Sequence, residues 1–167
     1  VFLKKAIESI YSQSYKNWEI IFWDNQSTDS SQSIAQSFDK KIKYHYSKVH
    51  TNLGRARKLA LEKANGDYIA FLDCDDEWLP KKLEQQVYQL ENNREFGFCY
   101  TGVYYINEMG KNIVTYFPKA KTGNVFPQQL LNYEIGIQSV LIRSGVPLTF
   151  KEELEYCPDY DLLINIS

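Results

Sequence analysis

The sequence predicts an α/β fold: a Rossmann-like, mainly parallel sheet flanked by helices, followed by a mixed second half. Apolar, aromatic and β-branched runs at residues 18–23, 42–46 and 68–72 have the composition of strands. Segments with the apolar spacing of helices alternate with these runs. Because strands that alternate with helices build parallel sheets covered by helices, the order of segments favours an α/β layer structure.

The expected helices run from residue 2 to about 12–14, from about 28 to 38, from 53 to 64 and from 81 to 92. Gly66 supplies a left-handed residue that ends the third helix, and Pro80 precedes the fourth. Residues 96–106 and 113–117 are expected to be strands joined by a turn at Gly110. The second half therefore mixes hairpin and helix.

Composition favours a single domain over residues 1–167, since 44% of the residues are hydrophobic. A net charge of -2 without a cluster of Lys and Arg argues against a nucleic-acid partner. Three cysteines without Cys-x-x-Cys spacing suggest neither a disulfide framework nor a zinc site, so we expect a cytoplasmic location, which includes the inner face of a membrane. No apolar run reaches the roughly 20 residues that span a bilayer, so no membrane segment is expected within these residues.

The segment from Asp73 to Glu77 places four carboxylates at the C-terminal end of an expected strand. Open α/β sheets bind ligands at that end. Four acids within five positions repel one another, and a divalent cation among them would offset the repulsion. Carboxylate oxygens suit Mg²⁺ or Mn²⁺, which accept diphosphate oxygens as further ligands. The segment therefore predicts a metal site.

Other interpretations of the same segment compete. A solvated turn is the default for an arbitrary pair of aspartates. A calcium loop fits the spacing of the acids, but Trp78 stands where that loop needs glycine. Cys74 reads as a small core residue rather than a nucleophile, because no histidine lies nearby in sequence and the acids would raise the pKa of its thiol.

Two further segments contain charged residues that suit a ligand-binding site. Asp24 follows an expected strand and has the position to accept hydrogen bonds from a base or a ribose, whereas Asp29 reads as a turn or cap residue. A helix then starts within Asn52-Leu53-Gly54-Arg55-Ala56-Arg57-Lys58. Its macrodipole disfavours cations in the first turn, so a ligand phosphate or an acidic neighbour would explain them.

In their order along the chain, these segments resemble the family 2 glycosyltransferases with the GT-A fold. The resemblance rests on Asp24-Asn25-Gln26-Ser27-Thr28-Asp29, on Asn52-Leu53-Gly54-Arg55-Ala56-Arg57, and on Phe71-Leu72-Asp73-Cys74-Asp75-Asp76-Glu77-Trp78-Leu79-Pro80. It covers residues 1–90 and fades between residues 96 and 165.

The resemblance implies roles for four residues. Asp24 would contact the nucleotide base, and Arg57 would help to hold the nucleotide. Asp73 would face the ribose and the metal, and Asp75 would be the direct metal ligand. The implied cofactor is Mn²⁺ or Mg²⁺, and the implied donor substrate is a nucleotide-diphosphate sugar.

The family usually places its catalytic base in an acidic pair just before a helix, in a pattern like Glu-Asp-Tyr-Asp-Leu. Here Asp159 matches the base, and Pro158 replaces the first acid. Asp159 and Asp161 are two residues apart and do not share a helix face, so at most one points at the sugar. The alternative is that Asp159 only caps the last helix.

The resemblance also implies that residues 1–167 are a fragment. The family's first strand, and its loop that contacts the nucleotide, have no counterpart in this sequence, and we expect the C-terminal remainder to be missing too. That strand would lie between the strands at 18–23 and 68–72. Both neighbours would then expose backbone donors and acceptors along facing edges.

The implied function is metal-dependent, inverting transfer of a sugar to a hydroxyl of a glycan or lipid-linked acceptor, in cell-surface polysaccharide or glycan biosynthesis. A sugar nucleotidyltransferase is one alternative, but the sequence contains no Gly-rich, Lys-containing phosphate loop. The other is a non-catalytic carbohydrate-binding protein on the same fold, which would not need Asp73, Asp75 and Asp159 together.

Overall fold

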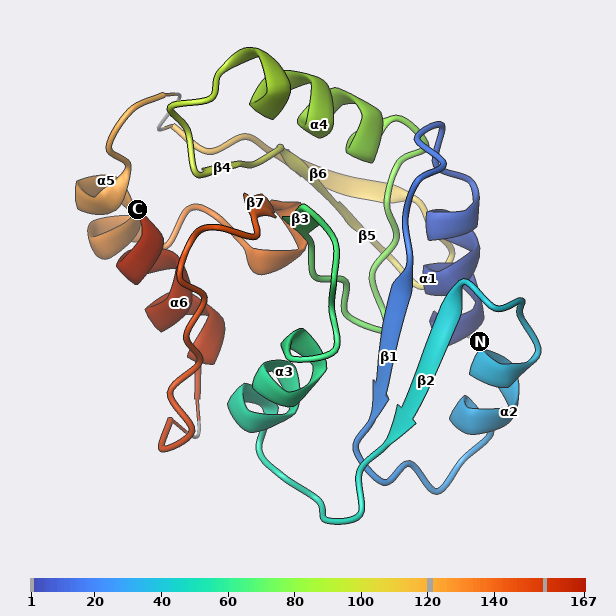
Figure 1. Ribbon diagram of the computed structural model, residues 1–167. Coiled ribbons are helices and arrows are strands. Elements are labelled where there is room, and N and C mark those ends of the chain that lie inside the picture. The colour runs from blue at the N-terminus through green and yellow to red at the C-terminus, as the bar shows by residue number, and fades with distance from the viewer. Residues whose placement is uncertain (1, 120–121, 155) are drawn as a thin grey trace.

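A computed structural model describes residues 2–119, 122–154 and 156–167, and its elements are shown in Figure 1. The first half comprises α1 (Phe2–Tyr11), β1 (Ile20–Asp24), α2 (Ser31–Gln36), β2 (Ile42–Tyr46), α3 (Leu53–Leu61), β3 (Tyr68–Ile69) and α4 (Lys82–Asn92). The second half comprises β4 (Phe98–Cys99), β5 (Val103–Ile106), β6 (Asn112–Tyr116), α5 (Phe126–Asn132), the 3₁₀ helix η1 (Ile137–Ser139), β7 (Leu141–Arg143) and α6 (Pro158–Ile166). The expected alternation of helices and strands is therefore present.

Strand pairing differs between the two halves. β1 and β2 are parallel, with Ile20 opposite Ile42 and Asp24 opposite Tyr46. β7 lies between β3 and β4 and is antiparallel to both, while β5 and β6 form an antiparallel hairpin. The α/β fold class is confirmed, with its parallel pairing in β1 and β2 and antiparallel pairing in the later strands.

Within the described residues, β1 pairs only with β2, and β3 pairs only with β7. Of the strand expected over residues 68–72, only Tyr68 and Ile69 pair with another strand, opposite Arg143 and Ile142. Pairing of β3 thus ends before the acidic segment begins. The additional strand expected between β1 and β3 stays a prediction.

Helices cover both sides of these strands. α4 packs on β4 and β7, whereas α2 contacts β1 and β2. α3 contacts both β1 and α6, and it lies between them in Figure 1. None of the helices in the described ranges is long and apolar enough to cross a bilayer.

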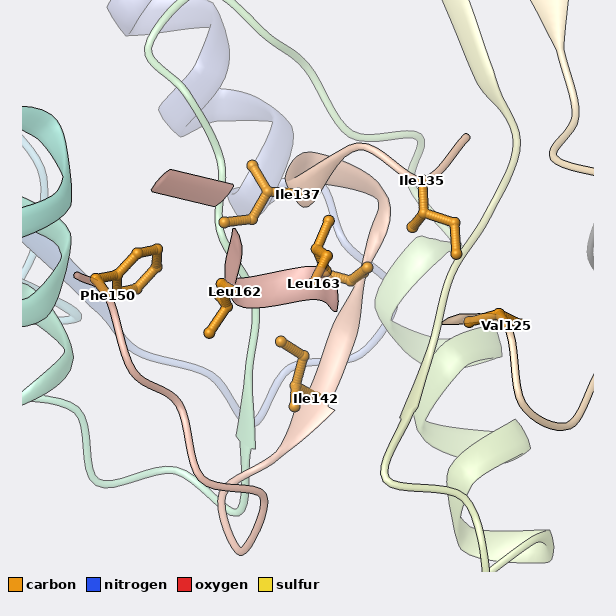
Figure 2. Packing of buried hydrophobic residues seen from close by; sticks show 8 residues of the cluster. Val125, Ile135, Ile137, Ile142, Phe150, Leu162 and Leu163 are labelled. Atoms are coloured by element: carbon orange, nitrogen blue, oxygen red, sulfur yellow. The ribbon is translucent and has the colours of Figure 1, made fainter. Parts of the chain in front are cut away.

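The main core gathers around β7 and α6, and Figure 2 shows its packing. Its buried members are Val125, Ile135, Ile137, Val140, Ile142, Phe150, Leu162 and Leu163. Successive strand residues point to opposite faces. Ile142 therefore faces this core, while Leu141 packs with Leu83 and Leu90 of α4 in a second cluster.

The hairpin of β5 and β6 carries exposed aromatic side chains. Tyr104 and Tyr105 are 50% and 57% exposed, and Phe117, just after β6, is 70% exposed. A two-stranded hairpin offers little apolar surface for its own side chains to bury. The hairpin turn has Gly110 at φ 76°, a backbone conformation that favours glycine.

Truncating Leu162 to alanine tests the importance of the core beneath α6. Leu162 is fully buried, so Leu162→Ala should lower the unfolding free energy by about 2–5 kcal/mol. Leu131 is 79% exposed on α5, so Leu131→Ala should stay within about 0.5 kcal/mol of the unchanged protein. Urea unfolding measures both, and equal losses would show that α6 does not depend on this core.

Candidate active site

The C-terminal end of the acidic segment after β3 is held in place by α1 and by the residues that follow this helix. The backbone N–H of Trp78 donates to Ser9 Oγ at 3.1 Å. The fully buried side chain of Gln13 donates to the Leu79 carbonyl at 2.9 Å and accepts from the Leu83 N–H at 3.1 Å. These bonds satisfy backbone groups at the start of α4. The loop is therefore fixed at this end, while its carboxylates remain at the surface.

Arg57 connects α3 to this segment. The Arg57 side chain is 10% exposed, and its Nη2 donates to Asp73 Oδ1 at 2.8 Å. Arg57 Nη1 is buried and has no hydrogen-bond partner within the described residues. Buried donors are nearly always paired in proteins. An anionic ligand at the Asp73 loop would supply the acceptor that this nitrogen lacks.

The remaining side chains of the segment face solvent to different degrees. Asp75 and Cys74 are exposed, so the interpretation of Cys74 as a core residue is wrong. Surrounding protein atoms and the carboxylates of Asp73 and Asp75 raise the pKa of the Cys74 thiol, as expected. Partial burial, Asp75 and Asp73 likewise raise the pKa of Asp76. Negative charge is thus concentrated in this loop.

This loop offers a cation two well-suited groups rather than a complete site. No cluster of three or more His, Cys, Asp or Glu side chains that would hold a metal occurs in the described part of the chain. Asp73 and Asp75 would offer oxygen ligands to a cation, and Mg²⁺ or Mn²⁺ typically completes its shell with water and substrate oxygens. The donor set therefore fits a cation that binds together with a phosphate-bearing ligand.

Asp24 lies at the end of β1 and is only 2% exposed. Its carboxylate accepts from the Tyr44 hydroxyl at 2.6 Å and from the Ser27 N–H at 2.7 Å. Burial opposes ionisation, but these hydrogen bonds outweigh it, and the pKa of Asp24 is lowered. In contrast, Asp29 accepts from the Ser31 N–H at 2.9 Å, the local helix-start role expected for it.

The two exposed cations of α3 have a protein partner. Arg55 Nη1 and Lys58 Nζ contact the Glu152 carboxylate at 2.7 and 2.6 Å. Asn52 caps the helix by accepting from the Arg55 N–H at 2.9 Å, and its amide donates to the Glu152 carbonyl at 2.6 Å. Of the two explanations for these cations, the acidic neighbour holds for Arg55 and Lys58.

The start of α3 also touches the start of α6. A Cβ added to Gly54 would lie 3.1 Å from the Lys151 carbonyl oxygen and 3.2 Å from Pro158 Cβ. Pro158 is fully buried. The residue that replaces the family's first acid therefore packs against the helix that carries Arg57.

Asp159 and Asp161 point to different partners, as their spacing predicts. The Tyr133 hydroxyl donates a short hydrogen bond to Asp159 Oδ2. Lys151 Nζ contacts Asp161 Oδ1 at 2.5 Å, so Asp161 is held in an ion pair. Cys157 is the N-cap residue of α6, with no side-chain cap bond, and Asp159 lies inside the first turn. The cap interpretation of Asp159 is therefore not supported.

The predicted site residues belong to one neighbourhood. Asp24 is close enough to Cys74 to contribute, after burial and the nearer Asp73 and Asp75, to the raised pKa of that thiol. Burial and Asp159 together raise the pKa of the Tyr133 hydroxyl, and the positive charge of Arg57 acts in the opposite direction. Tyr133, Tyr44 and Glu152 were not predicted from the sequence, where they carry no motif.

Comparison with known sequences identifies the family of the chain. The profile of glycosyl transferase family 2 matches residues 1–146, so the chain belongs to that family. A UDP-Glc:alpha-D-GlcNAc-diphosphoundecaprenol beta-1,3-glucosyltransferase of Escherichia coli is 31% identical over 168 residues, which cover 98% of this chain and 64% of that protein. An uncharacterised glycosyltransferase of Methanocaldococcus jannaschii is 33% identical over 171 residues, covering 98% of this chain and 59% of that protein.

Solved structures agree on the fold. The crystal structure of S. aureus TarS 1-349 in complex with UDP-GlcNAc matches with a TM-score of 0.76 at 19% identity, over 95% of this chain and 47% of that chain. The fold is therefore GT-A, as the sequence resemblance implied. The chain spans less than two thirds of each of these three proteins.

The buried Asp24 carboxylate predicts a pH-dependent loss of stability in Tyr44→Phe. Because the pKa of Asp24 is lowered in the folded state, its contribution is present above the unfolded pKa of about 3.9 and is lost as the pH falls through the folded value. Tyr44→Phe should therefore cost about 1.5–3 kcal/mol near neutral pH, and less below about pH 4.

Urea unfolding across this pH range measures the difference. Tyr46→Phe is the matched control, because Tyr46 neighbours the same strand end with its side chain exposed. A loss for Tyr44→Phe that does not change with pH would mean that the hydroxyl contributes packing rather than a bond to ionised Asp24.

Proposed function

We propose that this chain is the donor-binding part of a metal-dependent, inverting glycosyltransferase that moves a sugar from a nucleotide-diphosphate sugar to an acceptor hydroxyl. The observation that carries the proposal is the Arg57–Asp73 ion pair at 2.8 Å, with exposed Asp75 two residues further on. It combines a buried cation, one of whose nitrogens has no partner in the part of the chain that the structure describes, with carboxylates suited to a divalent ion. A nucleotide diphosphate and its cation need both kinds of group.

Asp73 and Asp75 would hold the cation, and Arg57 Nη1 would donate to the nucleotide. When bound, Mg²⁺ or Mn²⁺ would neutralise the charge that grows on the diphosphate as it departs. Asp24 would accept a hydrogen bond from the nucleotide base. Its buried carboxylate already accepts from Tyr44 and Ser27, and each carboxylate oxygen has capacity for a further donor.

Asp159 would act as the general base. The acceptor oxygen forms a bond to the anomeric carbon from the face opposite the diphosphate, the carbon–oxygen bond to the diphosphate breaks, and the hydroxyl proton passes to the Asp159 carboxylate. The nucleotide diphosphate leaves with the bonding electrons. Attack opposite the leaving group inverts the anomeric configuration.

Relatives suggest the substrate class and the setting. The name of the Escherichia coli relative specifies UDP-Glc as donor and a diphosphoundecaprenol-linked sugar as acceptor. The solved TarS complex contains UDP-GlcNAc. We infer a UDP-sugar donor, a glycan or lipid-linked acceptor, a role in polysaccharide biosynthesis, and a cytoplasmic location at the inner face of the membrane.

Product analysis separates this proposal from the two alternatives. A screen of the natural full-length protein against UDP-glucose and UDP-GlcNAc should release free UDP. Release of pyrophosphate would instead indicate a nucleotidyltransferase. Binding of either donor without turnover in the presence of a range of glycan acceptors would indicate a carbohydrate-binding protein.

Metal dependence of nucleotide binding tests the proposed cation site. UDP should bind the natural full-length protein in the presence of Mn²⁺ and at least about tenfold more weakly with a chelator, because the carboxylates alone repel the diphosphate. Asp75→Asn should remove most of this difference. Asp67→Asn is the control, because Asp67 is also exposed but lies before β3, away from the acidic segment. Calorimetry measures the affinities, and equal affinity with and without metal would contradict the site.

The proposed base Asp159 should affect turnover without affecting nucleotide binding. Asp159→Asn should leave UDP affinity in Mn²⁺ unchanged and lower kcat by about 10²–10⁴-fold, because only proton transfer is lost. Asp161→Asn should keep turnover, since Asp161 is paired with Lys151. Initial rates of UDP release measure both variants. Normal turnover in Asp159→Asn, with a loss in Asp161→Asn, would move the base assignment to Asp161.

A further inference from the structure

The backbone around Tyr133 is unusual. Tyr133 follows α5 with φ 45° and ψ 61°, a left-handed conformation in a residue that is not glycine. Such a conformation costs roughly 1–2 kcal/mol for an L-residue. Strain of this kind persists only where the surrounding structure imposes it, and it is frequent at functional sites.

Gln129 imposes this turn. Its backbone carbonyl accepts from the Tyr133 N–H at 3.0 Å, and its side chain is almost fully buried. The Gln129 side chain accepts from the Ile135 N–H at 3.0 Å and donates to the Ile135 carbonyl at 3.1 Å. The turn from α5 is thus tied on both sides of Tyr133, which fixes the backbone from which the tyrosine side chain projects.

The Tyr133 side chain reaches the first turn of α6. Its ring meets the Tyr160 ring edge to face, with centroids 4.8 Å apart, and its hydroxyl donates to Asp159 Oδ2. Within the described residues, no donor contacts Asp159 Oδ1. One carboxylate oxygen is therefore held by the protein, and the other is available to a ligand.

The bond also decides between two uses of Asp159. An aspartate in the first turn of a helix can bond to the free backbone N–H groups there, which would turn its carboxylate away from a substrate. α6 has no side-chain cap bond, and its N-cap Cys157 is itself left-handed at φ 49°. The hydrogen bond from the Tyr133 hydroxyl instead holds the carboxylate away from these backbone N–H groups.

We propose that Tyr133 is a positioning residue for the proposed general base, orienting the Asp159 carboxylate so that Oδ1 faces the acceptor hydroxyl. This inference rests on the proposed function of Asp159. The charge of Arg57, the residue proposed to hold the nucleotide, also acts on the Tyr133 hydroxyl and opposes the rise in its pKa. The reaction that it serves is the proton transfer to Asp159 described above.

A double-mutant cycle tests the proposal on the natural full-length protein, with UDP release from UDP-glucose or UDP-GlcNAc as readout. Tyr133→Phe keeps the ring contact with Tyr160 and should lower kcat about tenfold, with the donor KM within about twofold. In the Asp159→Asn background, the same replacement should change kcat by less than about twofold, because the oriented group is already lost. Tyr88→Phe, on the exposed face of α4, should change neither parameter.

The outcomes separate this inference from the base assignment. An unchanged kcat in Tyr133→Phe while Asp159→Asn is impaired would overturn the role of Tyr133 alone. A tenfold loss that persists in the Asp159→Asn background would also overturn it, because the hydroxyl would then act elsewhere. Normal turnover in Asp159→Asn would overturn the base and the positioning residue together. If Tyr133→Phe melts at a lower temperature, 3-fluorotyrosine at position 133 should restore kcat, since it keeps the donor and the ring.

Discussion

The arrangement of the site depends on the ion pair between Arg57 and Asp73. A guanidinium that is nine-tenths buried is costly unless a carboxylate and hydrogen bonds compensate for its lost hydration. α3 can therefore pack against β1 with Arg57 turned inwards only because the loop after β3 brings Asp73 to it. Within the described residues Nη1 of the same guanidinium has no acceptor, so one side chain joins the helix to the loop and also has a donor left for the proposed nucleotide.

Arg55 and Lys58, the other cations of α3, connect this helix to the segment before α6. Glu152 engages Arg55 and Lys58 from the segment that leads into α6, while Arg57 engages the loop after β3. One short helix thus joins the proposed nucleotide side of the site to the proposed base. Exposed ion pairs contribute little to stability individually. Their shared carboxylate instead links α3 to the segment around residue 152.

Features set by local sequence were predictable, and features set by distant contacts were not. Asp24 and Asp73 follow apolar runs that predict strands, although only Tyr68 and Ile69 of the second run pair as a strand, and Asp159 lies in a recognisable helix start. β3 and β7 are too short to show a periodicity, and their pairing joins segments far apart in sequence. Tyr133 could not be predicted, because its role requires a left-handed backbone that tyrosine does not favour. The exposure of Cys74 likewise depends on where β3 stops pairing.

Gly54 allows a close approach between α3 and the start of α6. With no side chain at this position, the Lys151 carbonyl and Pro158 approach to a distance at which even a methyl group would be tight. A side chain at this position would require the Lys151 carbonyl or Pro158 to give by a few tenths of an ångström. The absence of a side chain at position 54 is therefore what lets α3, which carries Arg57, lie directly against the start of α6, which carries the proposed base Asp159.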